Sequence, residues 1–289
     1  MKLSVIIPTC NRPSTLIRAV NSVLSQGIDS IEIIVVDDSS NDATFNALAL
    51  YVHSGQLRYF KNVVSRSGPA FSRNFGVNAA SGEFVTFLDD DDVYLQGRLA
   101  NMLELASSGV YVFISSGRFY ESDDFNVIKN VPRQIFGVIT LAQVQYANDI
   151  DIGFIVKRSL FQSLGGFDTS FKNLEDWDFV LRMLMTGDGF KHQRLDYAVN
   201  VNTNRPRVSS DDYVGYLQLA EKHQRFFGAE WYVYMLAMSA TLKGTMSSKM
   251  ALQLAFLGGS LAPIKIMIKA RLILLKKLHR LYRKLVATE

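Results

Sequence analysis

Four consecutive aspartates, Asp89 to Asp92, follow the apolar run Phe84–Leu88. Unpaired like charges at a strand end repel one another, so packing alone does not account for them. Mg²⁺ or Mn²⁺ would relieve the repulsion, because these hard cations prefer carboxylate oxygen and often keep substrate phosphates as ligands. A solvated acidic turn is the alternative interpretation. Because open α/β sheets bind ligands beyond the carboxyl ends of their strands, the position favours a metal-assisted phosphate site.

Two polar segments follow the first two expected strands. Pro8 and Thr9 lead into a loop of small polar residues whose N–H and hydroxyl groups suit a nucleotide, although for this segment alone helix capping by Thr9, Asn11 and Ser14 is the favoured explanation. After the second strand, Asp38 offers a carboxylate to a base N–H or a ribose hydroxyl, with an ordinary Asx turn as the alternative. Both segments are therefore candidate nucleotide contacts.

Two later segments add a cation and a cluster of acids. Arg73, in the segment Gly68–Gly76, could offer a guanidinium fork to a diphosphate, although arginines on a helix surface are common. Glu175, Asp176 and Asp178 occupy the first turn of an expected helix, where the helix dipole favours acids. One of these three carboxylates could instead act as a general base.

Strands and helices alternate along the first half of the chain, which predicts βαβ units and a doubly wound sheet. The runs of β-branched residues Leu3–Ile7 and Ile31–Val36 are typical of parallel strands buried on both faces. The expected further strands are 57–60, 83–88, 110–114, 153–157 and 197–202. The expected helices are 16–24, 43–52, 70–79, 98–106 and 174–185, followed by a mostly helical region after Asp211.

Charge is distributed unevenly along the 289 residues. Between Trp231 and Thr288 there are ten Lys or Arg and no Asp or Glu, so residues 231–289, which include Glu289, have a net charge of +9. Because the net charge of the whole chain is +4, residues 1–230 have a net charge of −5. The single Cys10 fits a reducing compartment, and no apolar run reaches the roughly 18 residues that a membrane span needs. We expect a catalytic region, residues 1–210, followed by a helical region, residues 211–289, that ends in a basic tail.

The tail, residues 263–286, has the pattern of an amphipathic helix with many cations. On a helix its apolar face would hold Met267, Ala270, Leu274, Leu278, Leu281 and Leu285, and its opposite side Lys265, Lys269, Lys276, Arg280 and Arg283. This pattern favours binding to an anionic membrane surface. Packing onto the rest of the protein is the alternative, and nucleic acid is not expected because no binding module is recognisable.

Taken together, the segments resemble the family-2 inverting glycosyltransferases of GT-A fold over most of residues 1–210. No single segment is specific, but seven follow one another in the order and spacing of that family. They are Ser4–Thr9, Val35–Ser40, Ser72-Arg73-Asn74-x-Gly76, Ser81-Gly82-Glu83, Phe87–Asp92, Gly165–Asp168 and Glu175–Asp178. The resemblance implies an α/β, Rossmann-like, doubly wound and mostly parallel sheet, here with a helical basic C-terminal extension.

The resemblance also implies roles for individual residues. Asp91, in the stretch that matches the family's DXD motif, would bind Mn²⁺ or Mg²⁺ through the sugar diphosphate, and Asp176 looks like the catalytic base with Glu175 beside it. The implied donor-binding residues are Pro8, Thr9, Asp38, Gly68, Arg73, Asp89 and Asp90. Relatives often carry a histidine near a later serine-rich loop, and this chain lacks it, so Arg205 and Arg207 are only candidate diphosphate contacts.

The activity implied is metal-dependent, inverting transfer from a nucleoside-diphosphate sugar, in the first place a UDP-sugar. The acceptor would be a lipid-linked saccharide or an oligosaccharide of surface polysaccharide or O-antigen type. The protein would then be cytoplasmic and attached peripherally to the inner face of the cell membrane. Two alternatives remain: a nucleotidyltransferase, which needs no base at Asp176, and a catalytically silent nucleotide-sugar-binding protein.

Overall fold

The computed structural model describes residues 2–28, 30–62, 67–122, 128–201 and 212–286, apart from the side chains of Leu274 and residues 277–286. It divides into two compact units. One comprises Met1–Ser170 with Glu175–Arg205, and the other Phe171–Leu174 with Pro206–Glu289. The predicted boundary after residue 210 lies outside the described residues.

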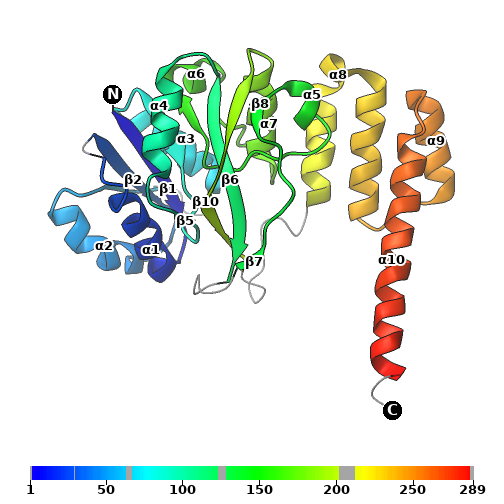
Figure 1. The fold of residues 1–289 in the computed structure, drawn as a ribbon, viewed down its shortest axis with the longest axis horizontal. Coiled ribbons are helices and arrows are strands. Elements are labelled where there is room, and N and C mark those ends of the chain that lie inside the picture. The colour runs from blue at the N-terminus through cyan, green and yellow to red at the C-terminus, as the bar shows by residue number, and fades with distance from the viewer. Residues whose placement is uncertain (1, 29, 63–66, 123–127, 202–211, 287–289) are drawn as a thin grey trace. The chain divides into compact units, whose positions relative to one another are not determined.

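The first half of the unit that begins at Met1 is a parallel sheet in the order β3-β2-β1-β4 (Figure 1). Its strands are β1 (Leu3–Thr9), β2 (Ile31–Asp37), β3 (Arg58–Lys61) and β4 (Phe84–Phe87). Almost every residue of β1, β2 and β4 is buried, as expected for β-branched runs covered by helices on both faces. The carboxyl ends of these strands therefore lie along one edge.

Beyond β4 the sheet becomes mixed. The short strand β9 (Ile155–Lys157) lies between β4 and β6 and is antiparallel to both, whereas β6 and β10 are parallel to each other. The remaining strands are β6 (Phe113–Glu121), β10 (Gly189–Asn200), β5 (Val93–Tyr94), β7 (Ile128–Asn130) and β8 (Gly137–Ile139). β4, β6 and β10 consequently point in the same direction, and most of the sheet is parallel in sense.

Several predicted boundaries in this second half were wrong. The strand expected at 110–114 begins at Phe113 and continues to Glu121, and the strand expected at 197–202 begins at Gly189. Both carry polar residues in the middle, such as Ser115 and Lys191, which broke the apolar pattern. These side chains are buried all the same, because a polar network within the fold pairs them.

Seven helices of this unit surround the sheet in the described part of the chain. They are α1 (Pro13–Leu24), α2 (Ala43–His53), α3 (Pro69–Ala79), α4 (Arg98–Ser107), α5 (Leu141–Val144), α6 (Arg158–Ser163) and α7 (Glu175–Leu184). α3 begins with Pro69 directly after Gly68, whose φ of 87° suits glycine. Gly76 lets α3 approach β1 closely, since a Cβ there would lie 2.5 Å from the side chain of Ile6. This close packing determines where Arg73 of α3 points.

The second unit is helical. α8 (Asp212–Leu242) is interrupted at Gly228, where φ is 82°, and its two ends meet through a 2.8 Å hydrogen bond from Ser239 Oγ to the carbonyl of Tyr213. α9 (Ser248–Gly258) and α10 (Ala262–Val286) pack on α8 around Val233, Ala237 and Leu254. Among the described helices none is both long and apolar enough to span a bilayer.

α10 does not use its two sides as the helical pattern predicts. Ile266 packs against the cluster shared with α8 and α9, and Met267 and Ala270 of the predicted apolar face are partly buried. Other apolar side chains of α10 are exposed instead, among them Ile268 and Leu272. In the first half of α10, the face that was expected to bind lipid therefore packs within the unit, which was the alternative to membrane binding.

Candidate active site

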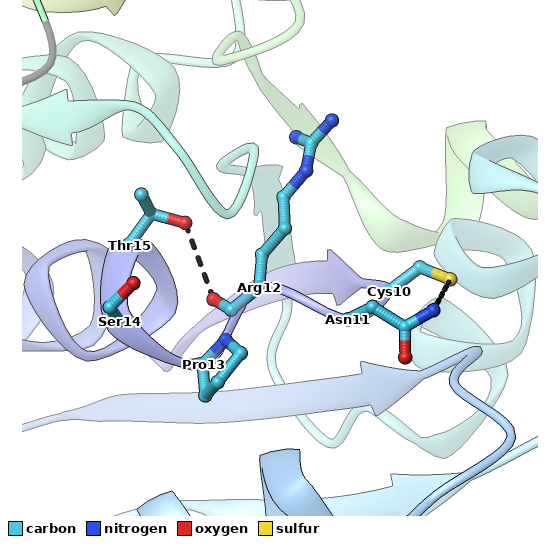
Figure 2. Close-up of a pocket in the computed structure, with 6 residues that line it drawn as sticks. All are labelled: Cys10, Asn11, Arg12, Pro13, Ser14 and Thr15. Atoms are coloured by element: carbon cyan, nitrogen blue, oxygen red, sulfur yellow. Dashed lines mark hydrogen bonds between the residues drawn. The ribbon is translucent and has the colours of Figure 1, made fainter. Parts of the chain in front are cut away.

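A pocket of about 310 Å³ lies where β1 ends and α1 begins, lined by the loop Cys10–Thr15 (Figure 2). Within this loop the Thr15 hydroxyl donates to the carbonyl of Arg12 at 3.3 Å, and Figure 2 shows the Arg12 side chain extending away from Pro13. The predicted donor residues Pro8 and Thr9 form the end of β1 directly before this loop. The pocket thus lies at the strand edge where a nucleotide was expected.

The four aspartates after β4 alternate between the interior and solvent. The side chains of Asp89 and Asp91 are 38% and 27% exposed, whereas Asp90 and Asp92 are buried. The Tyr197 hydroxyl donates to Asp92 at 2.7 Å, and the Asn200 backbone N–H donates to its other oxygen at 2.9 Å. Asp92 therefore anchors the run to β10, and Asp89 and Asp91 are left facing outward.

Asp90 links the run to β1. Its carboxylate accepts a hydrogen bond from the Thr9 hydroxyl at 2.7 Å and another from Arg12 at 3.0 Å. The same Arg12 nitrogen also lies 3.0 Å from Asp91. Burial raises the pKa of Asp90 to about 6, although Arg12 and Thr9 oppose the rise. Arg12 ends the polar segment that begins at Pro8, but the sequence analysis gave it no role of its own.

Asp38 is buried and anchors the loop that precedes α3. Its carboxylate accepts hydrogen bonds from the backbone N–H groups of Ser67 and Gly68, at 3.0 and 2.9 Å, and from the Asn62 amide at 2.9 Å. Asp38 and Gly68, both predicted donor-binding residues, are therefore in direct contact. A contact between Asp38 and a nucleobase stays a prediction.

Arg73 joins the donor side of the site to the predicted base. Its guanidinium donates to Asp89 at 2.6 Å and to Glu175 at 2.8 Å, and its side chain is buried. Burial by itself would lower the pKa of Arg73, but Asp89 and Glu175 outweigh it and raise the pKa. The two carboxylates thus occupy the fork that was expected to hold a diphosphate.

The three acids at the start of α7 have different surroundings. Glu175 pairs with Arg73, and the buried Asp178 pairs with Arg182 at 2.7 Å. Arg182 also donates to the carbonyls of Leu164 and Gly166, so Asp178 stabilises the adjoining turn. Asp176 forms no salt bridge within the described residues. Among these three described acids, Asp176 alone therefore has a carboxylate without an ion pair to a cation, and it lies close enough to Asp89 to be influenced by its charge.

Asp176 has the acidity expected of a general base. Its pKa is raised to about 7, mainly by loss of hydration and next by the neighbouring Glu175, against the opposing effects of the Trp177 N–H and Arg73. Asp89 is a smaller contributor in the same direction as Glu175. A carboxylate with this pKa is partly deprotonated at neutral pH and can accept a proton there.

Asn148 is a second residue that the sequence analysis missed. Its Oδ1 accepts the backbone N–H of Ile150 at 2.9 Å, which fixes the orientation of the amide and leaves Nδ2 to face Asp176 Oδ2 at 3.4 Å. The other Asp176 oxygen accepts the Trp177 N–H at 2.8 Å. The indole of Trp177 in turn donates to the carbonyl of Val144, which holds α7 against α5. No sequence signal points to Asn148, because it lies in a loop 28 residues before the base.

The acidic run fits a divalent cation whose ligands come partly from a substrate. Within the described chain no group of three or more His, Cys, Asp or Glu side chains is arranged to hold an ion. Mg²⁺ and Mn²⁺ are commonly held by one or two carboxylates together with substrate phosphates, and Asp91 with the neighbouring Asp89 meets that requirement. Arg205 and Arg207, the candidate diphosphate contacts, lie outside the described residues.

A family model described as "Glycosyl transferase family 2" matches residues 4–165, which include the carboxyl end of every strand described above except β10. The chain is 44% identical over 109 residues to the Campylobacter jejuni GalNAc(5)-diNAcBac-PP-undecaprenol beta-1,3-glucosyltransferase. That match covers 37% of this chain but only 35% of the relative. Three uncharacterized glycosyltransferases from Rickettsia species are covered over 16–23% of their length.

A longer match is the Escherichia coli UDP-Glc:alpha-D-GlcNAc-diphosphoundecaprenol beta-1,3-glucosyltransferase WfaP, 29% identical over 65% of this chain and 72% of the relative. Among solved structures, Staphylococcus aureus TarS 1–349 in complex with UDP-GlcNAc superposes with a TM-score of 0.67. It is 21% identical, and the match covers 87% of this chain and 76% of that one. The latter likeness supports the GT-A fold expected from the sequence.

Proposed function

The chain belongs to glycosyl transferase family 2, and on that premise we propose that it transfers a sugar from a nucleoside diphosphate to an acceptor hydroxyl, with inversion at the anomeric carbon. The observation that carries the proposal is the chain of ion pairs from Asp89 through Arg73 to Glu175. It brings the acidic run and the helix of the base into one site. A protein that only bound a nucleotide sugar would have no use for a carboxylate of raised pKa at that place.

In the proposed reaction Asp176 removes the proton of the acceptor hydroxyl as its oxygen attacks the anomeric carbon. The bond from that carbon to the diphosphate oxygen breaks, and the nucleoside diphosphate leaves from the opposite face of the sugar. One displacement inverts the configuration, so no covalent glycosyl-enzyme is needed. Asn148 and the Trp177 N–H hold the Asp176 carboxylate in place. Arg73 pairs with Glu175, so that the negative charge of Glu175 beside Asp176 is balanced.

We propose Mn²⁺ or Mg²⁺ as the cofactor, held by Asp91 with Asp89 nearby. When bound, the cation supplies charge neutralisation for the departing diphosphate. The residues of this chain contribute the rest: Thr9 and Arg12 hold Asp90, and Asp92 anchors the run to β10. The donor-binding roles of Pro8, Thr9, Asp38, Gly68 and Asp90 belong to the same proposal.

A UDP-sugar is the donor that the relatives favour. Two of the matching TarS structures are complexes, one with UDP-GlcNAc and one with UDP, and the WfaP name specifies UDP-Glc. The names of the C. jejuni and E. coli relatives both specify a saccharide linked through diphosphate to undecaprenol. We therefore propose a lipid-linked saccharide acceptor, used in the synthesis of a surface polysaccharide. Such an acceptor would keep the protein at the cytoplasmic face of the membrane, attached peripherally.

The test is turnover by the full chain with a panel of nucleotide sugars and a saccharide linked to diphosphoundecaprenol or a short-chain analogue. We expect release of a nucleoside diphosphate that depends on Mn²⁺ or Mg²⁺, and a product of inverted anomeric configuration by NMR. In a parallel assay with a nucleoside triphosphate and a sugar 1-phosphate, release of pyrophosphate would instead identify a nucleotidyltransferase. Tight donor binding with no turnover of any acceptor would identify a silent binding protein.

A further inference from the structure

α9 and the first half of α10 expose large apolar side chains. We define the exposed apolar set as Leu252, Phe256 and Leu257 of α9 together with Ile268, Leu272 and Leu275 of α10. Phe256 is 93% exposed, and the other five are between 48% and 64% exposed. Scattered apolar side chains are ordinary on protein surfaces, but six of them on two packed helices are not.

The exposed apolar set is separate from the packing surfaces of its helices. On α9, Leu252 and Phe256 are four residues apart and share a face, whereas Ala251 and Leu254 are buried on the other side. On α10, Ile268, Leu272 and Leu275 follow the spacing i, i+4, i+7 of a single stripe. Packing within the unit therefore leaves this stripe unused.

Cations flank the apolar stripe. Lys265, Lys269 and Lys276 follow one side of the stripe on α10, Arg271 lies on the other side, and Lys249 is exposed on α9. The sequence between Trp231 and Thr288 contains no acid, and Glu230, just before it, accepts a hydrogen bond from Ser260 Oγ at 2.9 Å. The surface is therefore both apolar and strongly positive, a combination that matches lipid chains below a layer of anionic headgroups.

We infer that α9 and α10 bind the surface of an anionic bilayer through the exposed apolar set, with the flanking cations at the headgroups. The inference rests on the proposed function only in its choice of a membrane, where a lipid-linked acceptor would reside. It differs from the sequence-based expectation in two respects: α9 takes part, and the stripe on α10 is not the Met267 face. Nucleic acid would use the cations but not Phe256, and a second copy of the chain would meet the same positive charge.

Point variants test the surface better than truncation, because removing α10 also removes Ile266 from the packed cluster. The double variant Phe256→Ser/Leu272→Ser should bind vesicles of 70% phosphatidylcholine and 30% phosphatidylglycerol at least tenfold more weakly than the unchanged chain. Burial of one large apolar side chain is worth about 1.5–3 kcal/mol, which is roughly tenfold or more in affinity. Leu50→Ser is the matched control, since Leu50 of α2 is 83% exposed in the other unit, and it should bind normally.

The charges need their own variant. Lys265→Gln/Lys269→Gln should weaken binding to the same vesicles several-fold, and the difference from the unchanged chain should shrink in 0.5 M NaCl because salt screens exposed charges. Lys129→Gln, an exposed lysine on β7, is the control that should change nothing. Thermal melting of each variant checks that the fold is retained.

Three results would overturn the inference: unchanged vesicle binding by the Phe256→Ser/Leu272→Ser variant, equal binding to vesicles of pure phosphatidylcholine, or loss of a dimer in place of loss of vesicle binding. Donor turnover measured on the same samples separates the two proposals. A chain that binds vesicles yet turns over no donor contradicts the proposed function alone. A chain that turns over donor but ignores vesicles contradicts the membrane surface alone.

Discussion

Arg73 of α3 and Glu175 of α7 meet at 2.8 Å although 102 residues separate them in the chain. The second nitrogen of the same guanidinium reaches Asp89, two residues beyond the end of β4. One buried cation thus connects three elements that sequence reasoning could place only one at a time. Removing one partner of such a pair leaves a buried charge uncompensated, which generally costs about 3–5 kcal/mol.

Arg73→Lys should impair the activity, although the substitution leaves the charge at this position unchanged. A lysine ammonium is a point charge without the planar fork, so it cannot hold Asp89 and Glu175 in the same geometry. We expect a lower melting temperature and a lower kcat/KM, with kcat falling more than donor affinity because the helix of the base is released. Arg158→Lys is a control that changes an arginine donating to the carbonyl of Gly82. Normal kinetics for Arg73→Lys would show that the bridge does not position the base.

Asp91→Asn should abolish metal-dependent donor binding while preserving the fold. Asp91 is partly exposed at the end of a strand, so its replacement by an isosteric amide should leave the melting temperature within a few degrees of the original. Calorimetry with UDP and Mn²⁺ measures the loss directly. Asp188→Asn, an exposed aspartate before β10, serves as the control. Normal turnover of Asp91→Asn across a Mn²⁺ titration would rule out the metal assignment.

Asp176→Asn should lower kcat by roughly 10²–10⁴, the usual contribution of a positioned base, and leave donor affinity nearly unchanged. Asp178→Asn is the informative comparison, because Asp178 is buried and paired with Arg182. That variant should lose stability rather than chemistry, and its remaining folded fraction should turn over donor. Equal losses of kcat in both variants, with equal melting temperatures, would contradict a catalytic role for Asp176 and a stabilising role for Asp178.

The pH dependence of kcat/KM should show an acid limb near pH 7, since Asp176 must lose its proton to act as a base and its pKa is raised to about 7 by burial. Asn148→Leu removes a donor to the charged form, so the limb should move to higher pH. We expect about one unit, because a hydrogen bond to a charged group is worth roughly 1.5–3 kcal/mol and one pKa unit about 1.4. Asn46→Leu, on the surface of α2, should leave the profile unchanged.

Glu175→Gln should move the same limb in the opposite direction. Glu175 is the charge that, after burial, most raises the pKa of Asp176, so removing it favours the ionised base. Compared with the unchanged chain, the acid limb should therefore lie at higher pH in Asn148→Leu and at lower pH in Glu175→Gln. Limbs that move in the same direction, or do not move at all, would mean that another group titrates.

The sequence was sufficient to predict the strand ends but not the contacts between them. β1, β2 and β4 are continuous buried runs, so the polar residues at or just beyond their ends, Thr9, Asp38 and Asp89, could be expected at one edge. The bonds from Arg12 to Asp91 and from Asn148 to Asp176 depend on loop conformation, which leaves no periodic signal. β9 is three residues long, too short for a pattern to show that it runs antiparallel.

The tail shows the same limit in a different way. An amphipathic pattern indicates that a helix has an apolar face, but α10 has apolar residues on more than one side. Which side packs is decided by α8 and α9, whose cluster takes up Ile266. Only the tertiary structure therefore distinguishes the side that is already occupied from the stripe at Ile268 and Leu272.

Because β9 runs opposite to its neighbours, the contact to the predicted base and the contacts predicted for the donor come from separate stretches of the sequence. In a parallel sheet every loop at the ligand edge follows a strand, and here those loops carry Thr9, Asp38 and Asp91. Because β9 is antiparallel to β4 and β6, the segment that precedes it reaches the same edge, and this segment carries Asn148. Within residues 145–152, Asp149 and Asp151 pair with the buried Lys191 and Arg98, which ties the segment to the mixed half of the sheet. The residue that contacts the predicted base is thus held by the mixed half of the sheet, whereas Thr9, Asp38 and Asp91 are held by the parallel half.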